Sequence, residues 1–112
     1  MFETPLAPEK LEEILTRLRA GLEELLGEQL EAVYLYGSHA RGDARPDSDI
    51  DVLIIMKEDF DYGEVLSRTL DLTAALSLEH DVVISRAFFT RERFEHEKSP
   101  FLMNVRREAV IA

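Results

Sequence analysis

The sequence contains no cysteine and no apolar run long enough to cross a membrane. Without cysteine, the chain cannot form disulfides or thiolate metal sites. A membrane-spanning helix needs about 20 consecutive apolar residues, and a secretory signal needs a basic segment followed by an apolar one. Neither pattern is present, so we expect a cytoplasmic protein that does not enter a membrane.

Basic residues are also scarce. The chain has 13 Lys and Arg against 23 Asp and Glu, which gives a net charge of −10. Proteins that bind nucleic acid over a broad surface use clustered Lys and Arg, so the composition argues against nucleic acid as a partner. An acidic chain is compatible with metal ions and with a basic partner protein, although most of these carboxylates are expected to form a solvated surface.

Periodic apolar residues predict the helices and strands of a small α/β fold. The length of 112 residues suits a single domain, 1–112. Apolar residues recur at three- and four-residue steps between Pro8 and Gly27, which predicts an amphipathic helix. The other expected elements are strands over 32–36, 49–56 and 81–85, and helices over 62–78, 91–98 and from Ser99–Pro100 onward. We therefore expect a sheet of about three core strands flanked by helices.

Two aspartates at the start of the second expected strand form a candidate metal site. Side chains alternate across a strand, so Asp49 and Asp51 point to the same face. Two nearby carboxylates repel each other unless a cation lies between them, and such hard oxygen ligands suit Mg²⁺. Pairs of this kind also occur by chance on surface strands, so the spacing alone is weak evidence for a metal.

A glycine–serine turn, Gly37–Ser38, precedes this pair. Glycine lets a backbone approach a ligand closely, and a helix that begins at Ser38 would direct free N–H groups toward an anion. Arg41 could supply a guanidinium to the same anion. The alternative is a polar turn in which Ser38 caps the helix. If the loop joins the turn to the carboxylates, a nucleoside triphosphate with Mg²⁺ would bridge them. The pattern is not a P-loop, because no Gly-Lys-Ser/Thr follows.

The fuller stretch GSHARGDARPDSDIDVLI, residues 37–54, resembles the signature of the minimal nucleotidyltransferase branch of the DNA polymerase beta-like nucleotidyltransferase superfamily. The resemblance implies the nucleotidyltransferase fold with a small mixed sheet. It implies that Gly37 and Ser38 hold the β- and γ-phosphates of ATP. It also implies that Asp49 and Asp51 bind two Mg²⁺ ions.

Members of this family carry a third carboxylate on the following strand. Asp81, at the head of DVVIS, occupies the corresponding place. By resemblance, Asp81 would complete one metal site and help to deprotonate the attacking hydroxyl, so that Asp49, Asp51 and Asp81 form the catalytic set. Glu79 lies two residues away and would share the same face of a strand, so it stays an alternative to Asp81.

The activity that the resemblance implies is transfer of a nucleoside monophosphate, AMP from ATP, to a hydroxyl. In the minimal family the usual partner is a HEPN-domain protein encoded by a neighbouring gene, and the acceptor is a tyrosine of that toxin. The chain would then be an antitoxin. Two alternatives stay open: a non-catalytic module that neutralises a partner by docking, and a transferase that acts on a small hydroxylated substrate.

Other residues near the motif have weaker claims to a role in the site. Tyr34 and Tyr36 lie on one face of the first expected strand, and we expect them in the core rather than stacked on a base. His39 and Arg45 are expected to be solvated, with contact to phosphate or Mg-ATP as the alternative.

Overall fold

Helix α1 (Pro8–Leu26) opens the part of the chain that the computed structural model describes, residues 6–112. Pro8 suits the first turn, where the helix needs no backbone N–H, and Gly27 ends the helix with φ of 56°. The predicted spacing of three and four residues places the buried side chains on one face. These are Ile14, Leu18, Leu22 and Leu26. A short 3₁₀ turn, η1 (Gly27–Gln29), follows.

Four strands form one mixed sheet in the order β3-β2-β1-β4. They are β1 (Leu30–Tyr36), β2 (Ile50–Met56), β3 (Ile84–Thr90) and β4 (Val110–Ile111). β2 pairs in parallel with β3, and β1 pairs antiparallel with both β2 and β4. A parallel pair needs a crossover connection, and helix α3 (Tyr62–His80) supplies it. The prediction of a small mixed sheet flanked by helices is confirmed.

The third strand begins later than the sequence pattern predicts. The pattern predicts a strand over 81–85, but α3 continues to His80, and Asp81 ends the helix in a left-handed conformation with φ of 53°. The strand begins only at Ile84. The sequence pattern does not predict β4, because two residues are too few to show an alternation of apolar and polar side chains.

Two short helices follow β3, and both begin where the sequence predicts. They are α4 (Arg91–His96) and α5 (Pro100–Glu108). The hydroxyls of Thr90 and Ser99 cap their first turns. Arg106 of α5 donates hydrogen bonds to two backbone carbonyls at the end of α4, which ties the two helices together. In the described part of the chain, no helix is both long and apolar enough to cross a bilayer.

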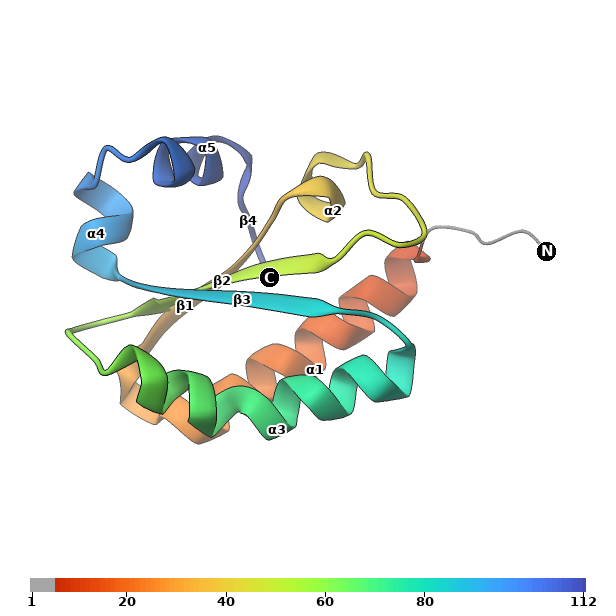
Figure 1. Cartoon of the computed structure of the whole chain (residues 1–112), viewed down its shortest axis with the longest axis horizontal. Helices are drawn as coiled ribbons and strands as arrows, with labels where there is room; N and C mark the ends of the chain where they lie inside the picture. The colour runs from red at the N-terminus through yellow and green to blue at the C-terminus, as the bar shows by residue number, and fades with distance from the viewer. Residues whose placement is uncertain (1–5) are drawn as a thin grey trace.

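The helices cover the two faces of the sheet unequally (Figure 1). The long helices α1 and α3 lie on one face, where Val52 and Ile54 of β2 are buried in the larger core. The short helices α4 and α5 lie on the other face, where Leu53 and Ile55 belong to a smaller core. Because side chains alternate along a strand, Asp51 belongs to this second face.

Candidate active site

The glycine–serine turn and the aspartate pair meet at one end of the sheet. β1 ends at Tyr36, Gly37 turns the chain, and the short helix α2 (Ser38–Arg41) follows. The loop after α2 leads back into β2, whose antiparallel register pairs Tyr36 with Asp51. The hairpin formed by β1 and β2 therefore brings the turn to the start of the carboxylate-bearing strand.

Gly37 lies directly against Asp51 of β2. A Cβ atom at this position would overlap the Asp51 carboxylate. The φ of 76° at Gly37 also lies in a region that residues with a side chain rarely adopt. Gly37 itself occupies the N-cap position of α2, so the alternative in which Ser38 caps this helix is wrong. Ser38 lines the hollow beside the turn instead.

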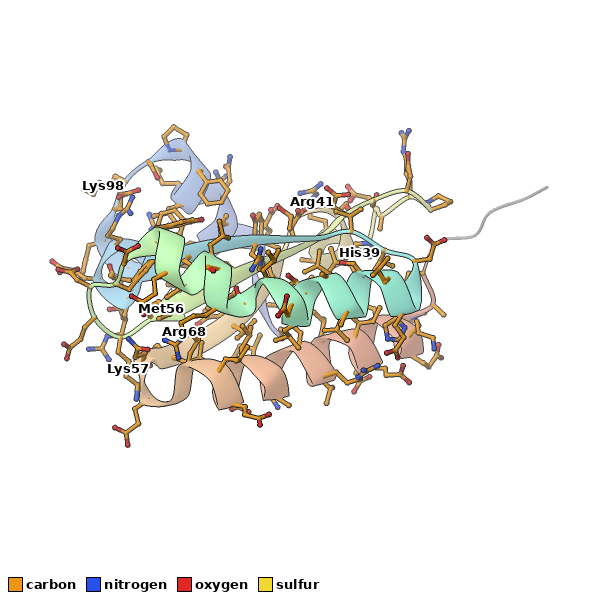
Figure 2. The ribbon with its side chains drawn as sticks, turned by 60° about the horizontal axis from the view of Figure 1, so that its bottom comes forward. His39, Arg41, Met56, Lys57, Arg68 and Lys98 are labelled. Carbon is orange, nitrogen blue, oxygen red and sulfur yellow. The ribbon has the colours of Figure 1, made fainter. Side chains whose placement is uncertain are left out.

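Hydrogen bonds inside the loop hold the residues that precede the aspartates. The Ser48 hydroxyl accepts a hydrogen bond from the backbone N–H of Arg45 at 2.8 Å, and the His39 ring is hydrogen-bonded to the Ser48 carbonyl at 3.3 Å. Figure 2 shows His39 on the same part of the molecule as Arg41. His39 therefore supports the segment that enters Asp49, a role that the sequence analysis does not predict.

The hollow beside the turn, of about 350 Å³, also contains a carboxylate that the sequence analysis does not predict. Glu108, the last residue of α5, accepts a hydrogen bond from the Gly37 N–H at 3.1 Å. It accepts a second from the Arg41 guanidinium at 3.0 Å. Arg41 also donates to Asp43 at 3.3 Å. Two of the groups predicted to bind an anion therefore bind a carboxylate of the chain itself.

The surroundings of Asp51 disfavour its ionised form. Burial raises the pKa of Asp51, and the charge of Asp49 raises it further, as does Glu108 to a smaller extent. His39 and Arg41 lower it in part. A divalent cation would offset the repulsion between ionised carboxylates. The donors are oxygen atoms, which Mg²⁺ prefers, so this pair of residues fits such an ion.

Asp81 lies outside this group of carboxylates. Asp81 caps the end of α3, and β3 places Ser85 beside Asp51. The prediction that Asp81 lies on a strand is wrong, because the left-handed turn at this residue separates it from β3. Among residues 6–112, no three His, Asp or Glu side chains are placed to hold one metal ion. The structure thus does not add Asp81 to Asp49 and Asp51 as a third ligand of one metal ion.

Glu79, the alternative to Asp81, is engaged elsewhere. It lies in the last turn of α3 and forms an ion pair with Arg17 of α1. Hydrogen bonds from Arg17 hold the pKa of Glu79 below its usual range. The prediction that Glu79 shares a face with Asp81 fails, because both residues belong to the end of a helix, where positions two apart do not face each other.

The two tyrosines of β1 are partly buried against the smaller core, in line with the prediction. Tyr34 stacks on Phe94 of α4 with ring centroids 5.1 Å apart, and Tyr36 meets Phe101 of α5 edge-on at 5.7 Å. Burial raises the pKa of Tyr36, which also lines the hollow beside the turn. The aromatic packing under α5 therefore forms one wall of the candidate site.

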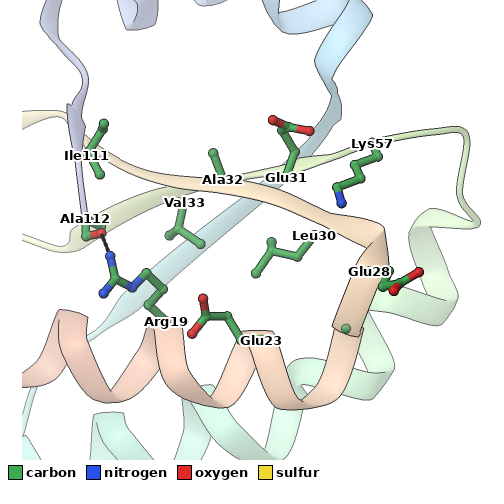
Figure 3. Close-up of a pocket in the computed structure, with 11 residues that line it drawn as sticks. Arg19, Glu23, Glu28, Leu30, Glu31, Ala32, Val33, Lys57, Ile111 and Ala112 are labelled. Carbon is green, nitrogen blue, oxygen red and sulfur yellow. Dashed lines mark hydrogen bonds between the residues drawn. The ribbon is translucent and has the colours of Figure 1, made fainter.

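A second and larger hollow, of about 640 Å³, lies between α1 and the edge of the sheet formed by β1 and β4 (Figure 3). Arg19 crosses it and donates a hydrogen bond to the Ala112 carbonyl at 3.1 Å. Charges of both signs line this hollow, among them Glu23 and Lys57. None of the residues of the glycine–serine and aspartate motif reaches it, so we place the candidate site at the turn despite its smaller volume.

Residues 20–99 match the family described as polymerase beta, nucleotidyltransferase. The chain belongs to this family. The match includes the turn, both aspartates, α3 and β3. The resemblance of residues 37–54 to the nucleotidyltransferase signature is thereby confirmed.

Two relatives of this chain are each named as a protein adenylyltransferase. A Methanocaldococcus jannaschii protein, provisionally named a protein adenylyltransferase, is 33% identical over 79 residues, which are 70% of this chain and 79% of the relative. The protein adenylyltransferase MntA of Thermococcus cleftensis is 33% identical over 76 residues, 68% of this chain and 75% of the relative. Both alignments thus cover about two thirds or more of each partner.

Solved structures share the fold of this nucleotidyltransferase at lower identity. One chain of a toxin–antitoxin complex with AMP-PNP matches with a TM-score of 0.59 and 16% identity, over 87% of this chain and 70% of that chain. The second structure is a tri-AMPylated HEPN toxin of Shewanella oneidensis in complex with an MNT antitoxin. One of its chains matches with a TM-score of 0.53 and 16% identity, over 89% and 69%. At this identity the likeness concerns the fold alone.

Proposed function

We propose that this nucleotidyltransferase transfers AMP from ATP to a hydroxyl of a partner protein and releases pyrophosphate. The observation that carries the proposal is the contact between Gly37 and the Asp51 carboxylate, which sets an anion-binding backbone beside candidate metal ligands. A triphosphate that binds with its metal ion needs both kinds of group within a short reach. The relatives named as protein adenylyltransferases support a protein as the acceptor.

The turn and the aspartate pair have different tasks in this proposal. The N–H of Gly37, the hydroxyl of Ser38 and the guanidinium of Arg41 would hold the phosphates of ATP. Asp49 and Asp51 would hold Mg²⁺, two ions by resemblance to the family. Bound Mg²⁺ would offset the charge that develops on the leaving pyrophosphate. The hairpin geometry keeps the phosphate donors and the carboxylates in one fixed relation.

Asp81 is the proposed third carboxylate and the acceptor of the hydroxyl proton. The proposal requires the segment between α3 and β3 to bring Asp81 toward the pair on β2, the strand beside β3. Asp81→Asn should then slow AMP transfer. Glu79→Gln is the matched control, since the carboxylate that it removes is paired with Arg17 of α1, and it should leave the rate of transfer unchanged.

The proposed acceptor is a tyrosine of a HEPN-domain toxin, and the chain would act as the antitoxin. A tyrosine hydroxyl has a pKa of about 10, so it needs help to lose its proton at neutral pH. Attached AMP would add a bulky, negatively charged phosphodiester that blocks the toxin by size and charge. The AMPylated HEPN toxin in complex with an MNT antitoxin supports this type of partner.

The direct test is intact mass spectrometry of the proposed partner, a HEPN-domain protein from a neighbouring gene, after incubation with the chain, ATP and Mg²⁺. We expect mass increments equal to AMP. The increments should disappear with Asp49→Asn or Ser38→Ala, and tryptic mapping should locate them on tyrosine. A modification found only on serine or threonine would contradict the tyrosine assignment.

One observation favours the alternative of a non-catalytic docking module. The anion-binding groups of the turn already hold the carboxylate of Glu108. A partner that is fully inhibited yet carries no added mass would establish docking as the mechanism. The same mass measurement therefore separates the two functions.

A further inference from the structure

We propose that Glu108 is a built-in competitor of the triphosphate, which must displace the Glu108 carboxylate in order to bind. The inference rests on the proposed function, because it concerns the same phosphate-binding turn. It adds a residue of α5, far from the motif in sequence, to the set that decides how tightly the nucleotide binds.

The first argument is the way in which the carboxylate is held. The Oε1 atom accepts from the Gly37 N–H at 3.1 Å, and the Oε2 atom accepts from Nη1 of Arg41 at 3.0 Å. Two donors that converge on the two oxygens of one anion form the arrangement that also recognises a phosphate group. The Glu108 side chain is only 23% exposed, so this carboxylate is held against the turn rather than extended into solvent.

The second argument is electrostatic. Asp49 and Asp51 already bring negative charge to this end of the sheet, and Glu108 adds to the unfavourable potential at Asp51. A triphosphate would bring several more negative charges to the same donors. Its phosphate oxygens and the Glu108 carboxylate cannot both occupy the Gly37 N–H, and they repel each other. Nucleotide binding therefore requires Glu108 to leave.

The third argument is that Glu108 can leave without unfolding α5. Arg106 anchors the body of the helix through 2.6 Å hydrogen bonds to the carbonyls of Phe94 and Glu97. Glu108 is the last residue of the helix, and its side chain lies over an open hollow rather than inside the core. A change of side-chain rotamer is enough to free the donors, so the competition acts on affinity and leaves the fold unchanged.

The test compares Glu108→Gln with the wild-type chain by isothermal titration calorimetry against tripolyphosphate in Mg²⁺ buffer. Tripolyphosphate probes the phosphate site without a nucleoside and without transfer chemistry. The amide is nearly isosteric and removes the competing charge, so we expect it to bind tripolyphosphate about three- to tenfold more tightly. A non-hydrolysable ATP analogue should show the same gain.

The matched control is Glu95→Gln. Glu95 is an exposed residue of α4 that carries the same charge and is not part of the hollow, so its replacement should leave the affinity unchanged. Glu108→Ala serves as a second variant, and the melting temperature of each variant shows that it is folded. An equal gain from Glu95→Gln would assign the effect to net charge and overturn the inference.

The remaining outcomes separate this inference from the proposed function. Equal binding by wild type and Glu108→Gln overturns the competitor role but leaves the nucleotide site in place. Weaker binding by Glu108→Gln shows that Glu108 positions the turn for the ligand, which also overturns it. If neither the wild-type chain nor any variant binds tripolyphosphate or the ATP analogue, the phosphate site itself is absent. The proposed function then fails together with the inference. Tighter binding without any transfer of AMP supports the inference and contradicts only the proposed reaction.

Discussion

Neighbouring residues of β2 face very different surroundings on the two sides of the sheet. Ile50, Val52 and Ile54 are 0% exposed and pack under the long helices α1 and α3. Asp51, on the opposite side, borders a hollow of about 350 Å³. The short helices α4 and α5 cover that side only in part, over Leu53 and Ile55.

This comparison assigns different tasks to the two faces. The face under α1 and α3 is closed and apolar, so burial of its side chains supplies most of the stability of the sheet. The face under α5 is open at one end, which lets charged groups gather where solvent and ligands reach them. Substitutions on the closed face should therefore change stability, and substitutions at the open end should change activity.

The largest expected effect is on transfer. In the proposed reaction, Asp51→Asn should reduce the rate of AMP transfer by about 10²–10³-fold or more, because it would remove the charge proposed to hold the metal and stabilise the reacting phosphate. Initial rates followed by mass spectrometry of the partner measure it. Asp47→Asn, an exposed residue of the same loop, removes the same charge and should retain the wild-type rate. A wild-type rate of AMP transfer in Asp51→Asn would contradict the assignment of activity to the open end of the sheet.

The next effect is on stability at the closed face. Ile54→Ala should lower the free energy of unfolding by about 2–5 kcal/mol, since it leaves a cavity in the larger core. Urea denaturation measures this loss. Leu78→Ala, at a position 85% exposed, should change the free energy of unfolding by no more than about 0.5 kcal/mol. A similar loss at both positions would contradict the division between the faces.

Gly37→Ala should lower stability by about 1–3 kcal/mol, because its backbone conformation strains a residue with a side chain and the new methyl group meets the Asp51 carboxylate. A double-mutant cycle separates the two causes. In an Asp51→Gly background the collision is gone, so the cost of Gly37→Ala should fall while the strain of φ persists. Unchanged cost in that background would show that the turn and the carboxylate are not coupled.

The smallest expected effect is a gain in stability. The pKa of Asp51 is raised in the folded state, so its ionised form opposes folding. Asp51→Asn should then stabilise the metal-free protein at pH 7 by a few tenths to about 1 kcal/mol, a gain limited by solvent screening. The gain should vanish as the pH falls below the ordinary pKa of an aspartate, where wild-type Asp51 is neutral in both states. Melting curves in chelator at pH 7 and pH 3.5 measure this difference, and a large loss at pH 7 would show that Asp51 is structural.

The sequence predicts those structural features that depend on residues close together along the chain. The stripe of α1, the starts of α4 and α5, and the motif of residues 37–54 are local patterns, so these helices and the position of the turn follow from them. The start of β3 does not, because the backbone of Asp81 is left-handed and β3 begins only at Ile84, after two valines that also suit a strand.

Long-range contacts set the rest of the site. Glu108 accepts a hydrogen bond from the Gly37 N–H, which is 71 positions away in the sequence. In the sequence, Glu108 looks like any other acidic residue on an exposed helix, so nothing marks it as part of the site. The pairing of Glu79 with Arg17 likewise depends on how α1 packs against α3. No periodicity or residue spacing in a single sequence predicts either contact.

The central claim is that the Gly37–Ser38 turn and the Asp49–Asp51 pair are two halves of one site for a triphosphate and its metal. Calorimetric titration of ATP into the wild-type chain tests it most directly, with Mg²⁺ present in one experiment and excess chelator in the other. The account predicts binding in Mg²⁺ that is lost in chelator, and its loss in Mg²⁺ after Asp51→Asn. Equal binding of ATP in Mg²⁺ and in chelator would contradict it.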